Sequence, residues 1–379
     1  MAGVRTLIPM GTDGSLAYWD YIRVQGLLSL QGGVEDDESA LSNEEVVFIT
    51  VHQVFELWFK LILRESRTAR DLFGRDVVAN QELSGAVRSL ERVITILGRA
   101  TDHFGVMETL STRDYLAFRD KLTSASGFQS AQMRELEIVL GLDSSERIDA
   151  GAAGNWLEML RNSDGTESWS SRRVLATLDE RHTLREAIES WLVRTPIDGV
   201  PHDAPTAAQK LGGFIETFLA AHGREVNAAC EAALARAELG IDPEARRRRA
   251  EDEKATVRAF FAPTEEEGGA KRARIRCAML FIETYRELPL LAWPREVLDK
   301  LVELEQALVL FRQRHARMVE RIIGRRTGTG GSSGVDYLDA VAQKYRVFRD
   351  LWTIRTLQIR REAAPTLENA EYYGFAHDD

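Results

Sequence analysis

The sequence predicts an all-α protein built as a helical bundle. Most segments of its 379 residues carry apolar side chains at steps of three and four, the period of an amphipathic helix. No segment shows a convincing alternation of apolar and polar residues, the pattern of a half-buried strand. Two long segments carry the clearest helical pattern, and each places one histidine in the middle of an apolar face.

The first of these helices is expected over residues 42 to 65. Ser42 and Glu45 have the spacing of a capping box, which marks a helix start. Residues 46 to 63 are apolar nearly all round, which on a helix indicates burial among other helices. One face of this helix, at steps of four, three and four, carries Phe48, His52, Phe55 and Phe59.

The second helix is expected to begin at Pro294 and to end at Gly324, since proline suits the first turn of a helix and glycine suits its exit. Its core stripe comprises Leu301, Leu304, Leu308, Phe311, His315, Met318 and Ile322. The loop that follows, residues 325 to 338, is rich in Gly, Thr and Ser, whose backbone amides and hydroxyls can bind a ligand. A flexible linker is the other interpretation of this loop.

A single buried histidine is commonly a hydrogen-bonded core residue, but two such histidines are less easily explained as core residues alone. An imidazole buried without a partner costs about 1–3 kcal/mol, so each ring needs an acceptor, a ligand or a metal. Glu-x-x-His pairs, a His-Glu-x-x-His helix and Cys-x-x-Cys-His are all absent from the sequence, which argues against di-iron, zinc and covalent haem sites. A non-covalent haem with one axial histidine fits what remains.

The rest of the chain indicates one mainly helical domain over residues 1 to 379, with a charged surface insertion over residues 240 to 276. Residues 246 to 249 are four arginines, but acidic neighbours and a net charge of −10 argue against nucleic-acid binding. Because no apolar stretch follows a basic start at the N-terminus, we expect no secretory leader, and we expect no apolar run long enough to cross a bilayer. Two distant cysteines agree with a reducing compartment, and we expect a cytoplasmic protein.

Several separated motifs resemble the tryptophan 2,3-dioxygenase family. They are Phe48-Ile-Thr-Val-His52-Gln-x-x-Glu56-Leu-Trp58-Phe-Lys60, Tyr115-x-x-Phe118-Arg119-Asp, residues 126 to 130 (SGFQS), residues 189 to 196 (ESWLVRTP), and His315 followed by residues 328 to 334 (GTGGSSG). The similarity extends from about Tyr18 to the Ala-Glu-Tyr-Tyr sequence near residue 373.

The resemblance implies a role for each matching residue. His315 would be the axial ligand of a haem b iron, with Ser126 and Gly127 close to the haem. His52 would be the catalytic distal histidine, which accepts a hydrogen bond from the substrate indole N–H. Arg119 would bind the substrate carboxylate and Thr329 the ammonium and carboxylate end, while Phe48, Tyr115 and Tyr21 would line the indole pocket. Tyr18 would lie in or near the pocket of a neighbouring subunit, because the family forms homotetramers.

The implied reaction inserts O2 across the indole C2–C3 bond of L-tryptophan to give N-formylkynurenine, the entry to tryptophan catabolism by the kynurenine route. Two departures from the family pattern leave alternatives open. Trp19 and Asp20 stand where relatives usually carry small or neutral residues, and Phe311 stands where they usually carry tryptophan. A dioxygenase or monooxygenase acting on a substituted tryptophan in secondary metabolism is one alternative, and a non-catalytic haem sensor is another.

Overall fold

The computed structural model describes residues 17–122, 130–142, 147, 157, 160–162, 164–180, 182–236, 242–326 and 334–374. These residues form α-helices joined by short 3₁₀ turns and contain no β-strand, which confirms the all-α prediction. The helices are α1 (Tyr18–Tyr21), α2 (Val24–Leu27), α3 (Asn43–Phe73), α4 (Asn80–Met107), α5 (Thr112–Phe118), α6 (Ala131–Leu140), α7 (Trp169–Leu178), α8 (Leu184–Val193), α9 (Ala207–Ala235), α10 (Pro243–Phe261), α11 (Gly269–Thr284), α12 (Ala292–Ile323), α13 (Val335–Lys344) and α14 (Arg349–Thr356).

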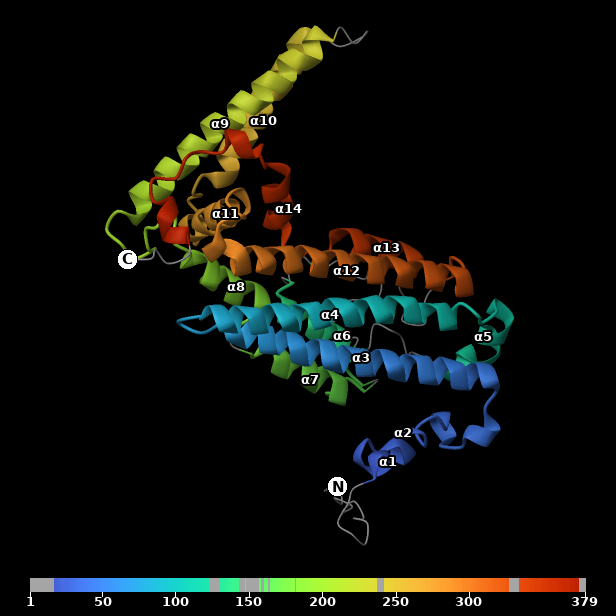
Figure 1. The fold of residues 1–379 in the computed structure, drawn as a ribbon. Helices are drawn as coiled ribbons and strands as arrows, with labels where there is room; N and C mark the ends of the chain where they lie inside the picture. The colour runs from blue at the N-terminus through green and yellow to red at the C-terminus, as the bar shows by residue number, and fades with distance from the viewer. Residues whose placement is uncertain are drawn as a thin grey trace.

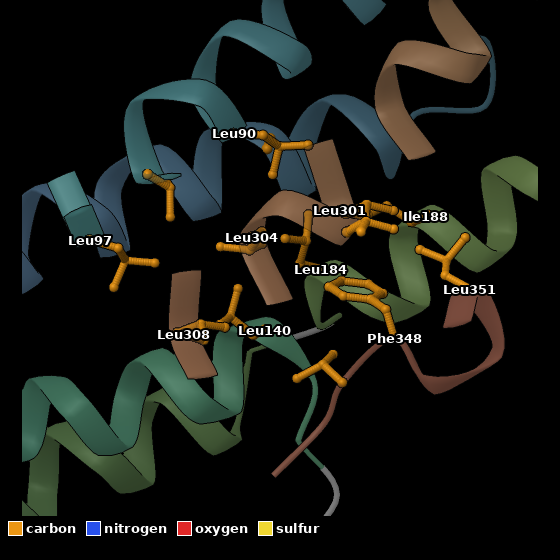
Figure 2. Packing of buried hydrophobic residues seen from close by; sticks show 14 of the residues in the cluster. Leu90, Leu97, Leu140, Leu184, Ile188, Leu301, Leu304, Leu308, Phe348 and Leu351 are labelled. Carbon is orange, nitrogen blue, oxygen red and sulfur yellow. The ribbon is translucent and has the colours of Figure 1, made fainter. Parts of the chain in front are cut away.

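Three long helices form the centre of the bundle. Helix α4 lies between α3 and α12 and packs along both, α6 and α8 pack on α3, and α13 runs beside α12 (Figure 1). Leucines from α4, α6, α8 and α12 meet in one apolar core, joined by Phe348 and Leu351 near the C-terminus (Figure 2). A shared core of this kind fixes the relative positions of the helices that carry the two histidines.

Both predicted helices are present, but α3 continues past its predicted end and α12 begins before its predicted start. Helix α3 begins after Ser42, whose hydroxyl accepts a hydrogen bond from the Glu45 amide at 3.2 Å. The second hydrogen bond of the predicted capping box, from the Ser42 backbone amide to the Glu45 carboxylate, is not formed. The Glu45 carboxylate binds Lys121 at 2.7 Å instead. Helix α12 begins two residues before Pro294 and ends before Gly324, which has a φ of 62°.

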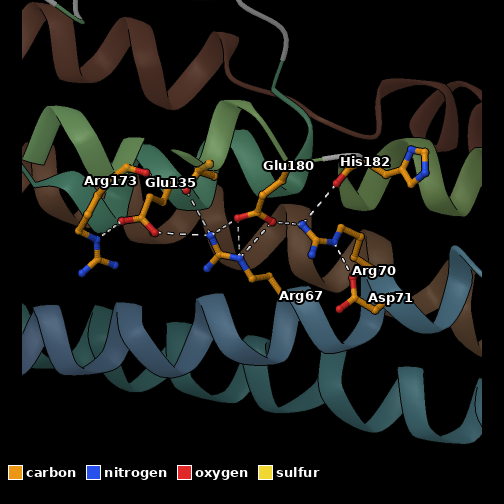
Figure 3. Close-up of polar contacts among 8 residues, drawn as sticks. Arg67, Arg70, Asp71, Glu135, Arg173, Glu180 and His182 are labelled. Carbon is orange, nitrogen blue, oxygen red and sulfur yellow. Dashed lines mark hydrogen bonds and ion pairs between the residues drawn. The ribbon is translucent and has the colours of Figure 1, made fainter. Parts of the chain in front are cut away.

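Ion pairs fix α3 to α6 and to the end of α7 (Figure 3). The Glu180 carboxylate is shared by Arg67, at 2.6 Å, and Arg70, both from α3. Arg67 also lies 3.5 Å from Glu135 of α6, which binds Arg173 of α7 at 2.6 Å. These partly buried pairs hold α6 in register along α3.

Helices α9 and α10 pair along their length and project away from the central bundle (Figure 1). Most of α10 is exposed, whereas α11 is buried from Ala273 onward. The charged interval 240 to 276 therefore contains one exposed helix and the start of a buried one. Its status as an insertion, and the single-domain organisation, stay predictions.

Helix α3 is long and apolar enough, by length and composition, to qualify as a membrane span. Our expectation that no apolar run has the necessary length was therefore wrong. Within the bundle, α3 packs against α4, α6 and α8, and its side chains Ile62, Ala69 and Phe73 are fully buried. Of the most apolar stretch of this helix, 28% is buried inside the structure.

A candidate cofactor and substrate site

Aromatic rings from four helices connect the two histidines into one site. Phe48 and His52 of α3 lie 4.1 Å apart between ring centroids, and Phe48 lies 6.0 Å from Tyr115 of α5. On the other side, Phe55 of α3 lies 4.6 Å from Phe104 of α4, which stacks on His315 of α12. The helical spacing of α3 predicted that the four rings it contributes lie on one face.

His52 presents a hydrogen-bond acceptor to this site. Its Nδ1 lies 2.7 Å from the Phe48 carbonyl oxygen, which can only accept, so Nδ1 carries the proton. Burial lowers the pKa of His52 below 6.5, although the Phe48 carbonyl and the nearby Glu56 charge raise it. At neutral pH the ring is therefore neutral, and Nε2 has a free lone pair. Although surrounding atoms desolvate the ring, His52 as a residue is not fully enclosed by the chain.

His315 has the properties of a neutral ligand. Burial lowers its pKa to about 4, with smaller contributions from the positive charges of His52 and Arg134. The Phe104 ring stacks on it at 5.4 Å and 7°, and no hydrogen bond to its ring nitrogens is found within the described part of the chain. Ring contacts that run from His52 through Phe55 and Phe104 to His315 place both imidazoles along one region between α3 and α12.

Arg119 follows Tyr115 by one helical turn, at the entrance to a 3₁₀ turn of residues 119 to 122. Tyr115 is buried against Phe118 and Phe48, so its ring forms part of the same array. Lys121, in this turn, binds the buried Glu45 carboxylate at the start of α3. The structure thus brings the turn that carries Arg119 to the helix that carries His52.

Of the remaining predicted site residues, the structure describes only the two tyrosines of α1, and it places them away from the two histidines. Tyr18 and Tyr21 lie on α1, are 75% and 71% exposed, and project with α2 away from the bundle (Figure 1). Ser126, Gly127 and Thr329 lie outside the described residues.

Three polar residues near the site were missed by sequence reasoning. His103 of α4 lies 5.0 Å from Phe55 and disfavours protonation of His52, and its Nε2 has no hydrogen-bond partner in the described structure. Glu56 and Arg134 influence His52 and His315 respectively. Helical spacing could have indicated Glu56, one turn after His52, whereas the other two depend on contacts between helices.

Comparison with known sequences defines the family. Residues 8–358 match the family described as tryptophan 2,3-dioxygenase. The chain belongs to this family. A Sorangium cellulosum protein named tryptophan 2,3-dioxygenase is 50% identical over 96% of this chain and 88% of the relative. A Ralstonia nicotianae protein named tryptophan 2,3-dioxygenase 2 is 47% identical over 96% of this chain and 98% of the relative.

A third member of the tryptophan 2,3-dioxygenase family covers less of the chain. It is a tryptophan 2,3-dioxygenase-like protein of Xanthomonas campestris, 45% identical over 70% of this chain and 98% of the relative. The family resemblance expected from the separated motifs is thereby confirmed. Among the described residues, no group of three or more His, Cys, Asp or Glu could hold a metal ion. A haem needs only one protein ligand to its iron, so the haem expected from the sequence would not require such a group.

Proposed function

We propose that this protein is a haem-dependent dioxygenase that inserts both atoms of O2 across the indole C2–C3 bond of L-tryptophan to give N-formylkynurenine. One observation carries the proposal. A neutral ligand, His315, and a neutral hydrogen-bond acceptor, His52, lie around one aromatic-lined region from two different helices. Near-full-length relatives named tryptophan 2,3-dioxygenase support the same reaction.

The residues present fit a haem with one axial imidazole. His315 is neutral, has no hydrogen bond in the described structure, and is flanked by the flat ring of Phe104. We assign His315 as the ligand to the iron of haem b, and place Ser126 and Gly127 near the haem. When bound, the haem supplies the activation of O2, which no side chain of the site can provide.

His52 would orient the substrate. An indole N–H is a donor only, and the Nε2 lone pair of His52 is the matching acceptor because Nδ1 donates to the Phe48 carbonyl. A single directional hydrogen bond fixes one edge of the indole, and this kind of restraint contributes to rate by positioning. Phe48 and Tyr115 would hold the faces and edge of the ring.

Arg119 would bind the substrate carboxylate, since a planar guanidinium can donate two parallel hydrogen bonds to it. Thr329 would bind the ammonium and carboxylate end. Such contacts select a free amino acid, because an analogue without the carboxylate leaves buried polar groups unpaired.

Tyr18 and Tyr21 would reach the site of a neighbouring subunit in a homotetramer. Supporting this arrangement, the segment of residues 18 to 34, which contains α1 and α2, has a series of exposed apolar side chains: Tyr18, Trp19, Tyr21, Ile22, Leu27, Leu28, Leu30 and Val34. Apolar surface of this extent is typical of a segment that is covered by a partner chain. Deletion of residues 1 to 41 should lower both the molecular mass measured by light scattering and the activity. A truncated protein with an unchanged number of subunits would contradict the proposed insertion of this N-terminal segment into a neighbouring subunit.

We further propose a cytoplasmic location.

A second candidate is oxidation of a substituted tryptophan, with one or two oxygen atoms retained. The observation that supports this second candidate is Phe311. Its buried ring packs on Phe104 and cannot donate or accept a hydrogen bond near His315. A hydrogen bond to His315 would therefore have to come from another group, and the donor strength of this imidazole towards a bound iron would depend on that group. A sensor without turnover is disfavoured by the presence of Arg119, since a gas sensor needs no carboxylate site.

The deciding experiment is turnover by the reduced, haem-loaded protein with L-tryptophan and labelled O2, analysed by mass. Gain of two oxygen atoms from O2 is the expected outcome, whereas one atom would indicate hydroxylation.

Competition with methylated and halogenated tryptophans tests the second candidate, which a clear preference for L-tryptophan in kcat/KM would eliminate. Unchanged turnover in both His52→Ala and Arg119→Ala would contradict the assigned roles. His315→Ala should lose haem on gel filtration, while His222→Ala, a buried histidine on α9, should retain it.

A further inference from the structure

Glu56 of α3 makes three polar contacts that the site described above does not use. Its Oε1 accepts a hydrogen bond from the Ser130 hydroxyl at 2.6 Å, and its Oε2 accepts one from Gln132 Nε2 at 2.7 Å. The same Gln132 amide also donates to the Glu56 backbone carbonyl at 2.7 Å. Ser130 Oγ in turn accepts from the Met133 amide at 3.2 Å, so both bonding directions of this hydroxyl are used. One carboxylate thereby fixes the start of α6 to the middle of α3.

The first turn of α6 also carries a buried arginine. Arg134 follows Ser130 by four residues and binds Glu137 at 2.9 Å. The position of Arg134 therefore depends on where α6 lies, and the Glu56 contacts fix the start of that helix on the helix of His52.

Glu56 also acts directly on His52, one helical turn away. The charged groups that shift the pKa of the His52 ring are Glu56 on α3 and His103 on α4. Glu56 is the one negative charge among them, and it raises the pKa that burial lowers. The backbone carbonyl of Phe48 acts in the same direction.

We propose that Glu56 is a positioning residue of the site: its carboxylate holds the N-terminal turn of α6 against α3, and its negative charge lies beside His52. This inference rests on the proposed function where it concerns turnover. The effect of the charge on His52 can be measured without turnover.

Four variants separate the two contributions. Glu56→Gln keeps the volume, removes the charge and sets its amide against the Gln132 amide. Ser130→Ala removes the hydroxyl donor and the helix cap but leaves the charge, and Ser130→Thr restores a hydroxyl. Glu65→Gln is the matched control, because Glu65 lies on the same helix and binds Arg92 of α4 at 3.0 Å.

The expected results differ between the variants. Glu56→Gln and Ser130→Ala should each lower kcat/KM by about 10- to 100-fold, the range for residues that orient a ligand through another group. Ser130→Thr should recover most of this loss. The acid limb of the kcat/KM profile should move to lower pH in Glu56→Gln only. Glu65→Gln should change neither quantity. Equal behaviour of Glu56→Gln and Glu65→Gln, or no recovery in Ser130→Thr, would overturn the proposal.

NMR titration of isotope-labelled histidine in the purified protein keeps this test separate from the proposed reaction. His52 should titrate at a lower pH in Glu56→Gln than in the unmodified protein, whether or not L-tryptophan is turned over. An unchanged His52 titration would overturn the role of the Glu56 charge. Absence of product in the unmodified protein, together with a shifted His52 titration, would reject only the proposed function.

Discussion

At the residue scale, the protonation state of His52 decides what the site can accept. The Phe48 carbonyl fixes the proton on Nδ1, and burial keeps the ring neutral above a pKa that lies below 6.5. Protonation of Nε2 would replace the acceptor with a donor, and two donors cannot hydrogen-bond to each other. An indole N–H would then be repelled from the position that His52 should fix.

This leads to a prediction for the pH dependence of kcat/KM. The value should be level above pH 6.5 and should fall about tenfold per pH unit once the pH drops below the His52 pKa, because only the neutral ring accepts. Measurement with L-tryptophan over a range of about pH 5 to 8, where histidine titrates, checks it. In His52→Ala this limb should disappear and the plateau should be lower. A limb that persists in His52→Ala would assign the titration to another group.

Sequence periodicity located the two histidines but not the contacts that set their chemistry. The shared face of Phe48 and His52 follows from helical spacing alone, since residues four apart are neighbours. The pKa of His315 could not be predicted, because it depends on helices far apart in sequence. His103 had no signal of its own, as its position beside Phe55 arises only where α4 packs on α3.

At the scale of elements, the Glu45–Lys121 ion pair joins the start of α3 to the turn that follows α5. Arg119 lies two residues before Lys121, so this pair fixes the turn from which the proposed carboxylate contact is made. Glu45 is buried, whereas the Lys121 side chain is half exposed. The pair is therefore stronger than a fully exposed one but is still partly screened by solvent.

Lys121→Met should raise KM for L-tryptophan by about two- to fivefold with a smaller change in kcat, as expected for a partly exposed ion pair that positions a binding group. Steady-state kinetics gives both constants. Lys254→Met is the control, because Lys254 binds Glu251 on the projecting helix α10. A larger effect on kcat than on KM would show that the turn contributes to the reaction rather than to binding.

The helix ends show the limit of what sequence predicts at this scale. The Ser42 cap and the Gly324 exit were recognisable, because capping depends on residues next to one another in sequence. The partner of Glu45 was not, since Lys121 lies in a different element. Helix α3 also continues to Phe73, eight residues past the predicted end, because Arg67 and Arg70 are held by Glu180 at the end of α7.

At the scale of the whole molecule, a buried ionic cluster connects α6 with α12 behind the site. Glu137, 2% exposed, binds Arg134 at 2.9 Å and Arg147 at 2.7 Å, and lies 3.7 Å from Arg312 of α12. Arg312 also donates to the Tyr345 carbonyl oxygen at 3.0 Å, which extends the contacts towards the C-terminal helices. Removing the one carboxylate that is shared by three arginines leaves buried positive charges uncompensated, which is far more costly than losing a surface pair.

Glu137→Gln should lower the free energy of unfolding by about 3–5 kcal/mol at neutral pH, the range for breaking a buried pair from one side. Burial opposes ionisation of Glu137, but the three arginines outweigh it and hold its pKa below 4.5. Since the folded state lowers this pKa, the carboxylate stabilises the protein above pH 4.5, and this contribution is lost as the pH falls through the folded-state value. Urea unfolding should therefore show a difference between the two proteins that is largest near neutrality and shrinks below pH 4.5.

The control variant Glu65→Gln should lower the free energy of unfolding by less than about 1 kcal/mol, because its partner Arg92 is largely exposed. Equal losses in Glu137→Gln and Glu65→Gln would mean that water or a rearrangement of the arginines compensates the missing charge.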